Sequence, residues 1–115
     1  MQNNSEILAD KIARLFLEKK AHDIIVMDLR SLTTMTDFFV IANGAVDIHL
    51  KALSDHLLSA LREEKIKPLH VEGYNNLQWV LIDFVDVIAH LFLPEQRKYY
   101  NIERLWSEAE VKRYE

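Results

Sequence analysis

The sequence is short of several residue types, and each shortage excludes a class of protein. None of its 115 residues is cysteine, which excludes a disulfide framework, a thiolate metal site and a cysteine nucleophile. It has two glycines and two prolines, while 50% of its residues are hydrophobic. Disordered, collagen-like and low-complexity chains have the opposite composition. We therefore expect one folded domain over residues 1–115, because domains commonly have about 100–150 residues.

Basic residues are also in the minority. The chain has 14 Lys and Arg against 18 Asp and Glu, which gives a net charge of −4 and a pI near 5.7. Nucleic-acid-binding domains usually carry a basic stripe and a high pI, so we expect little direct contact with RNA. A basic protein partner fits better, because complementary charge speeds encounter and favours correct docking.

Long apolar runs are missing as well. No run approaches the ~20 residues that a membrane helix needs, and residues 1–6 lack the basic and apolar regions of a signal peptide. These absences predict a cytoplasmic protein with no membrane partner.

The apolar residues that are present follow two periods, which predict helices and strands. Leu50, Leu53, Leu57 and Leu61 recur at helical spacing, whereas the residues from 23 to 29 form a short β-branched run typical of a buried strand. The predicted elements are a helix at 5–20, strands at 23–29 and 38–42, a helix at 47–65, three strands within 69–92 and a helical tail at 95–115. This α-β-β-α-β-β-β-α order predicts a mixed, five-stranded α/β sheet with helices packed on it.

The stretch from 69 to 92 alternates in polarity, so its strands have two different faces. Two-residue turns at 75–76 and 84–85 would place Trp79 opposite Glu72 and His90, and Asp83 opposite Asp86. One face is almost wholly aliphatic and predicts core. The other mixes aromatic, aliphatic and acidic side chains, and two interpretations of it stay open: an interior covered by a helix, or a partner surface with an aromatic anchor and an acidic border.

Motifs for catalysis are weak. Asp83 and Asp86 at a hairpin tip could hold a divalent cation, as carboxylate pairs do in phosphoryl transfer, but a solvated acidic turn is the favoured explanation, because no third carboxylate has a spacing that would let it join them. The five histidines form no metal motif, and a histidine beside Trp79 is typical of a hydrogen-bonded packing residue. Serine, histidine and aspartate form no nucleophile elbow. We predict no enzyme activity, no cofactor and no metal.

Several ordered motifs resemble the ribosomal silencing factor, or Iojap-like, family over nearly the whole chain. Residues 37–44 (Asp-Phe-Phe-Val-Ile-Ala-Asn-Gly) resemble its D-[YF]-F-V-I-x-x-G motif, and residues 72–92 resemble its E-G…W-x-L-x-D-x-x-D-[VI]-[VI]-x-H-x-F block. Residues 94–106 resemble its closing P-E-x-R-x-[FY]-Y…L-W motif. The chain departs from the pattern at Phe84-Val85, where the family commonly has Tyr-Gly.

The resemblance implies a fold and a function. The fold is a mixed sheet similar to that of nucleotidyltransferases, without evident catalysis. The function is translational repression: members bind the large ribosomal subunit through ribosomal protein L-fourteen and obstruct joining of the small subunit. The alternatives are a metal-dependent nucleotidyltransferase-like enzyme using Asp83 and Asp86, and a homodimer that buries the Trp79 face against a second copy. The predicted partner-binding residues are Glu72, Tyr74, Trp79, Leu81, Asp83, Asp86, His90 and Glu95.

Overall fold

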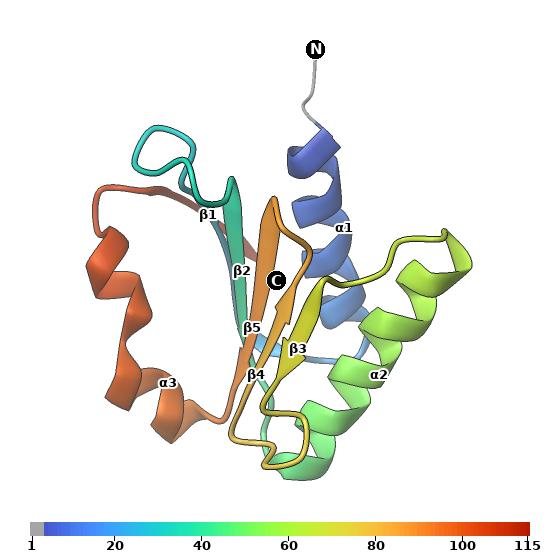
Figure 1. Cartoon of the computed structure of the whole chain (residues 1–115). Coiled ribbons are helices and arrows are strands. Elements are labelled where there is room, and N and C mark those ends of the chain that lie inside the picture. The colour runs from blue at the N-terminus through green and yellow to red at the C-terminus, as the bar shows by residue number, and fades with distance from the viewer. Residues whose placement is uncertain (1–3) are drawn as a thin grey trace.

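A mixed six-stranded sheet forms the centre of the computed structural model, which describes residues 4–115. Helices α1 (Asn4–Glu18) and α2 (Asp47–Glu63) lie on one face, and α3 (Pro94–Tyr100) lies on the other (Figure 1). A 3-10 helix, η1 (Ile102–Trp106), follows α3. The strands are β1 (His22–Asp28), β2 (Phe38–Asn43), β3 (His70–Glu72), β4 (Trp79–Asp83), β5 (Val87–Phe92) and β6 (Glu110–Tyr114). Within residues 4–115, no helix is long and apolar enough to cross a membrane.

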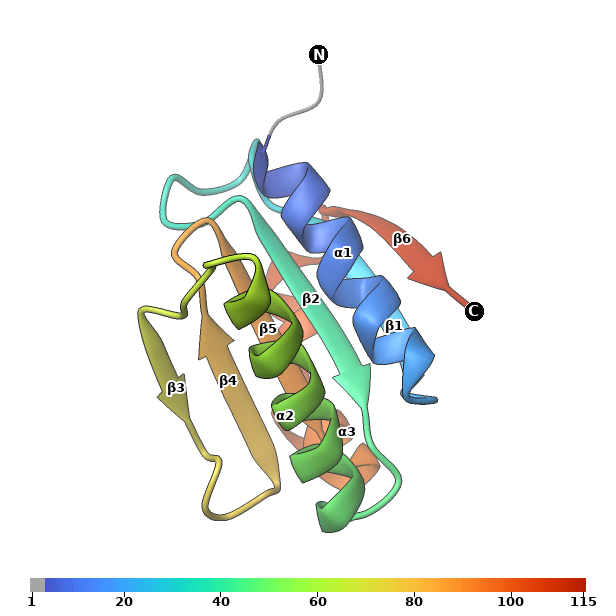
Figure 2. The ribbon, with the colours of Figure 1, turned by 90° about the vertical axis from the view of Figure 1, so that its right-hand side faces the viewer.

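The sheet order is β3-β4-β5-β2-β1-β6. Strands β2 and β5 run parallel, and the other neighbouring pairs run antiparallel. Figure 2 shows α1 and α2 side by side across one face of this sheet. The mixed α/β class that the sequence predicts is therefore confirmed.

The predicted number of strands and the predicted helical tail are wrong. The helix after Pro94 ends at Tyr100, because Asn101 adopts a left-handed conformation with φ of 43° that breaks the helix. The chain then forms η1 and returns along the outer edge of β1 as β6. This sixth strand is exposed at four of its five positions, three of which are charged, so it lacks the apolar pattern that identifies a strand in a sequence.

The main core lies between the sheet and the two helices α1 and α2. Large buried side chains from both layers meet there, among them Ile12 and Phe16 of α1, Leu50 and Leu57 of α2, and Ile82 and Leu91 of the sheet. A smaller core covers part of the opposite face, where Ile102 and Trp106 of η1 pack against Ile25, Met27, Ile41 and Phe92. The C-terminal segment, which runs from α3 through η1 (94–106), therefore covers β1, β2 and β5 more fully than it covers β3 and β4.

The two turns of the β3-β4-β5 meander differ from the predicted ones. Gly73 and Leu77 both have positive φ (80° and 54°) in a longer first loop, and Val85 takes a φ of 75° in the second turn. As a result Glu72 pairs with Leu81 rather than Trp79, and Trp79 pairs with Phe92 rather than His90. Each register is shifted by two residues, so every strand residue keeps the face predicted for it, because side chains alternate with a period of two.

Candidate partner-binding surface

Five predicted site residues lie on one face of the meander. Glu72, Leu81 and His90 follow one another across β3, β4 and β5 as directly paired residues, which share a face. Trp79 and Asp83 lie on the same face of β4, two residues to either side of Leu81. Leu81, Trp79 and Asp83 are half-buried and Glu72 is exposed. We name the exposed part of this face, with the neighbouring Tyr100, the Trp79 surface: Glu72, Trp79, Leu81, Asp83 and Tyr100.

Trp79 is held in place on three sides. Its ring stacks on Phe92 with centroids 4.9 Å apart and contacts the Tyr100 ring of α3 at 4.8 Å. Its indole Nε1–H donates a hydrogen bond to Nδ1 of His90 at 3.1 Å. The interpretation of this face as a covered interior holds as far as Tyr100. Beyond Tyr100 Trp79 is half-exposed, and the interpretation as a partner surface stays a prediction. A rigid, half-exposed tryptophan loses little conformational freedom when it binds.

His90 is the buried residue that accepts the hydrogen bond of the Trp79 indole. Its side chain is 4% exposed, and burial lowers the pKa of His90 to about 3, so the ring is neutral at physiological pH. Because Nδ1 accepts the indole hydrogen bond, the proton is on Nε2. That atom has no hydrogen-bond partner among the described residues, and the Phe39 ring lies edge-on to the imidazole at 4.6 Å. His90 is thus a packing residue that orients Trp79, as its position beside Trp79 suggests.

Three other predicted site residues lie outside the Trp79 surface as defined here. The hydroxyl of Tyr74 donates to Oδ1 of Asp55 on α2 at 2.7 Å, which directs Tyr74 toward the helical layer. Asp86 is in the β4–β5 turn, and Glu95 is in the first turn of α3, at the opposite end of the sheet (Figure 1). The structure therefore does not bring Tyr74, Asp86 and Glu95 into the Trp79 surface, and it buries His90 beneath that surface. The partner-binding role of the eight residues stays a prediction.

Asp83 and Asp86 do not form the facing carboxylate pair that a metal site would require. Asp83 pairs with Ile88 across the ladder, and its Oδ1 accepts a hydrogen bond from the backbone N–H of Val85 at 2.7 Å. The predicted pairing of Asp83 with Asp86 is wrong because the turn is centred one residue later. Among residues 4–115, no group of three His, Asp or Glu is placed to hold a metal ion.

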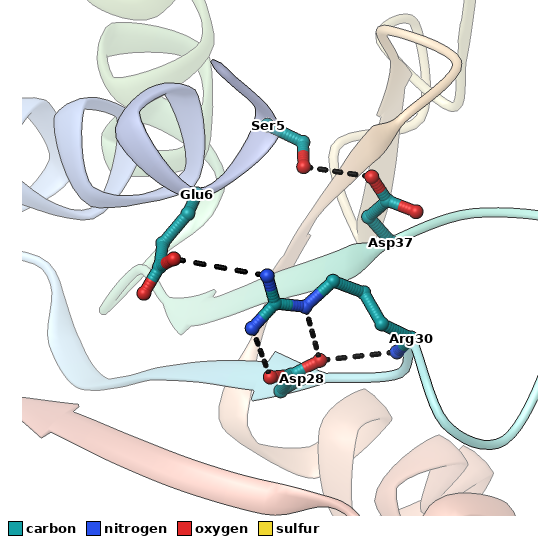
Figure 3. A network of polar contacts seen from close by, with 5 residues as sticks. All are labelled: Ser5, Glu6, Asp28, Arg30 and Asp37. Carbon is teal, nitrogen blue, oxygen red and sulfur yellow. Dashed lines mark hydrogen bonds and ion pairs between the residues drawn. The ribbon is translucent and has the colours of Figure 1, made fainter. Parts of the chain in front are cut away.

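The same end of the sheet contains a network of charged side chains (Figure 3). Arg30 reaches between two carboxylates: its guanidinium bonds to both oxygens of Asp28, at 3.0 and 2.7 Å, and lies 3.7 Å from Glu6. It also covers the Phe38 ring at 4.8 Å. Arg30 holds the pKa of Asp28 below its usual range. Beside it, Ser5 donates to Asp37 at 2.7 Å, so this network fastens the start of α1 to β1 and β2.

Residues of the C-terminal segment complete the surface, and the sequence interpretation did not include them. Arg97 is the anchor of this segment. Its Nη1 donates to the carbonyl oxygen of Asp23 (2.6 Å) and to Oδ1 of Asn43 (3.1 Å), and its Nε and Nη2 pair with the carboxylate of Glu103. These contacts tie α3 to β1, β2 and η1 and thereby fix Tyr100 against Trp79. Arg97 and Tyr100 are positions of the closing family motif at 94–106, but the motif alone does not indicate this role.

Comparison with known proteins gives the family of this chain. The family described as "Ribosomal silencing factor during starvation" matches residues 2–115. The chain belongs to the ribosomal silencing factor family. A ribosomal silencing factor from Halalkalibacterium halodurans is 35% identical over 92 residues, which cover 80% of this chain and 79% of that protein. The mouse "Mitochondrial assembly of ribosomal large subunit protein 1" is 32% identical over 101 residues, which cover 85% of this chain and 44% of that protein.

Two solved structures share the fold of this chain. A crystal structure of a Chromobacterium violaceum protein is similar, with a TM-score of 0.83 and 33% identity, covering 88% of this chain and 85% of that one. A Bacillus halodurans crystal structure has a TM-score of 0.77 at 34% identity, covering 90% and 95%. At this level of identity the likeness extends to sequence as well as to fold, in agreement with family membership.

Proposed function

We propose that this chain is a translational repressor that acts in the cytoplasm by binding the large ribosomal subunit and blocking the small subunit from joining. Its contact on the large subunit is ribosomal protein L-fourteen, with little direct contact to RNA. Obstruction of this kind needs affinity and bulk rather than chemistry, so the chain needs no catalytic residue, cofactor or metal. Family membership supports the coarser part, a ribosome-associated repressor.

The single observation that carries the proposal is the Trp79 surface. It presents an immobilised, half-exposed tryptophan beside a tyrosine, the residue types that dominate binding energy at protein interfaces. Two carboxylates, Glu72 and Asp83, flank this anchor on the same face. An aromatic centre with an acidic border favours a basic protein over the phosphate backbone of RNA.

Cosedimentation with purified large subunits tests the proposal, in the presence and absence of small subunits. We expect the wild-type protein to sediment with large subunits and to reduce the yield of joined ribosomes. Glu72→Lys should weaken binding, because it reverses an exposed border charge with little effect on packing. Trp79→Ala should weaken it more, by at least ~2 kcal/mol or about thirtyfold, if Trp79 is a hot spot.

The matched control is Leu69→Ala, which shortens an exposed side chain just outside β3 and should leave binding unchanged. Circular dichroism and thermal melting establish that each variant is folded. Unchanged binding by folded Trp79→Ala and Glu72→Lys proteins would refute the assignment of the surface. A protein that forms stable dimers and loses them on Trp79→Ala, without binding subunits, would instead support the homodimer alternative.

A further inference from the structure

The two parallel strands of the sheet, β2 and β5, end on the side of the sheet opposite the Arg30 network of Figure 3. Strands β2 and β5 are neighbours and run parallel, so both have their carboxyl ends there. The chain then continues from β2 into α2 on one face and from β5 into α3 on the other face (Figure 1). In α/β sheets, the crevice between two such diverging connections is the general location of ligand-binding sites.

A cleft of about 620 Å³ lies at this point. The connection after β2 contributes Ala45, Val46 and Asp47, the connection after β5 contributes Leu93 to Gln96, and the β3–β4 loop contributes Asn76 to Gln78. Its apolar lining is made of Val46, Leu77, Leu93 and Pro94, and Val46 is 58% exposed. The cleft therefore offers aliphatic walls that solvent currently covers.

The polar part of the lining is acidic. Asp47 and Glu95 are exposed, and the lining includes no Lys or Arg. Neither carboxylate forms an ion pair within residues 4–115, and Asp47 makes one local bond, accepting from the N–H of Ile48 at 2.8 Å. Both lie in the first turn of a helix, where the helix end contributes only about half a positive charge. Two full negative charges outweigh these partial charges, so the cleft attracts a cation rather than an anion.

The cleft lies at the same end of β4 as Trp79. Gln78 lines the cleft and directly precedes Trp79, and its carbonyl oxygen accepts a hydrogen bond from the N–H of Leu93, another lining residue. Glu95 and Tyr100 are also on the same short helix, α3. A partner that covers Trp79 can thus reach the cleft without a separate docking event.

We infer that this cleft is a second anchor site, which receives a lysine or arginine side chain of the protein partner that binds the Trp79 surface. The aliphatic walls contact the methylene stem, Asp47 and Glu95 bind the cationic head, and the side-chain oxygens of Asn76, Gln78 and Gln96 are available as further acceptors. This inference rests on the proposed function, because it takes the partner to be a basic protein. It assigns to Asp47 and Val46 a role that the sequence did not suggest.

The test is the affinity for large subunits of the double variant Asp47→Asn/Glu95→Gln, which keeps the shape of both side chains. We expect about tenfold weaker binding and a shallower dependence on salt. The control, Glu63→Gln/Glu108→Gln, removes two exposed charges that form no ion pair in residues 4–115 and should bind like the wild type. Equal binding by the two double variants would overturn the inference while leaving the proposed function intact.

A second measurement does not use ribosomes. It therefore tests the cleft separately from the proposed function, including the case in which the wild-type protein does not bind large subunits. We would titrate ¹⁵N-labelled protein with N-acetyl-lysine methylamide and with its uncharged counterpart, N-acetyl-norleucine methylamide. Saturable shifts at the amides of Val46, Leu77 and Gln96 should appear with the lysine compound only and be lost in Asp47→Asn/Glu95→Gln. Equal shifts with both compounds, or none with either, would overturn the inference. Spermidine is titrated in the same way. If it binds more strongly than the lysine compound, the ligand of the cleft is a free polyamine rather than a protein side chain, and the inference is overturned.

Discussion

At the scale of single residues, the pair of Trp79 and His90 shows what the sequence can and cannot predict. The alternating pattern placed Trp79 on the correct face, and a histidine beside a tryptophan indicated a packing role. The hydrogen bond from Nε1 to Nδ1 confirms that role. The register could not be predicted, because Leu77 and Val85 adopt positive φ, a conformation expected of Gly or Asn rather than of branched aliphatic residues.

The buried His90 should make stability depend on pH. In the folded protein the pKa of His90 is about 3, against about 6.5 in the unfolded chain. Between these values only the unfolded chain binds the proton, so the stabilisation is fully present above pH ~6.5 and is lost as the pH falls toward 3. The free energy of unfolding, measured with urea, should fall by about 1.4 kcal/mol from this group between pH 7.5 and 5.5.

A His90→Gln variant isolates this contribution from that of the carboxylates. Glutamine can still accept from the Trp79 indole through its amide oxygen, but it does not titrate. The variant should be less stable than the wild type at pH 7.5 and should lose less stability on going to pH 5.5. Parallel pH profiles for the two proteins would contradict a buried, neutral His90.

At the scale of elements, the two long helices and strands β1, β2, β4 and β5 follow from apolar periodicity, because each buries a stripe, a run or one alternating face. Strand β3 follows only from the alternation of polarity, since none of its three residues is fully buried. The C-terminal segment does not, because none of the residues in α3 or η1 is fully buried. Polar contacts hold this segment in place, together with the partly buried Ile102 and Trp106. Arg97 is central to the polar contacts, bonding at once to backbone and side-chain acceptors on three other elements, and such long-range contacts have no local signature in a sequence.

Removing the Arg97 guanidinium should therefore loosen the whole segment. We expect Arg97→Met to lower the free energy of unfolding by about 2 kcal/mol, less than the ~3–5 kcal/mol for a fully buried pair, because the Glu103 side chain is partly exposed. Amide hydrogen exchange should accelerate in α3, η1 and β6 more than in α1 or α2. Arg104→Met is the control, because Arg104 is exposed and makes no side-chain contact of this kind in residues 4–115. Uniform acceleration throughout the molecule would contradict a local anchoring role.

At the scale of the whole molecule, the pairing of β6 with the outer edge of β1 is the feature that the sequence does not predict. Strand β6 covers the outer edge of β1, whose Ile24 to Met27 are all buried. It is fastened by Tyr114, which is 9% exposed and donates to Asp10 of α1 at 2.5 Å. The remaining side chains of β6 face solvent, so a charged strand protects an apolar one from edge-to-edge association.

Deletion of residues 110–115 should expose that apolar edge. We expect the melting temperature to fall by roughly 10 °C, since burial of one large aromatic side chain is worth about 2 kcal/mol and each kcal/mol corresponds to about 4–8 °C. Light scattering should show concentration-dependent association. Removal of Glu115 alone, outside the strand, is the control. A truncated protein that stays monomeric and melts unchanged would show that β6 contributes nothing to the protection of β1.

The pairing of β1 with β6 also has a consequence for the order in which the protein is made. During synthesis β1 leaves the ribosome well before β6, because some 80 residues separate the two strands. Pairing with β2 covers only one side of β1 in the meantime, and unpaired apolar edges are the surfaces through which nascent chains associate wrongly. While the chain is still attached to the ribosome that makes it, one edge of the apolar strand β1 therefore stays unpaired until β6 has been synthesised.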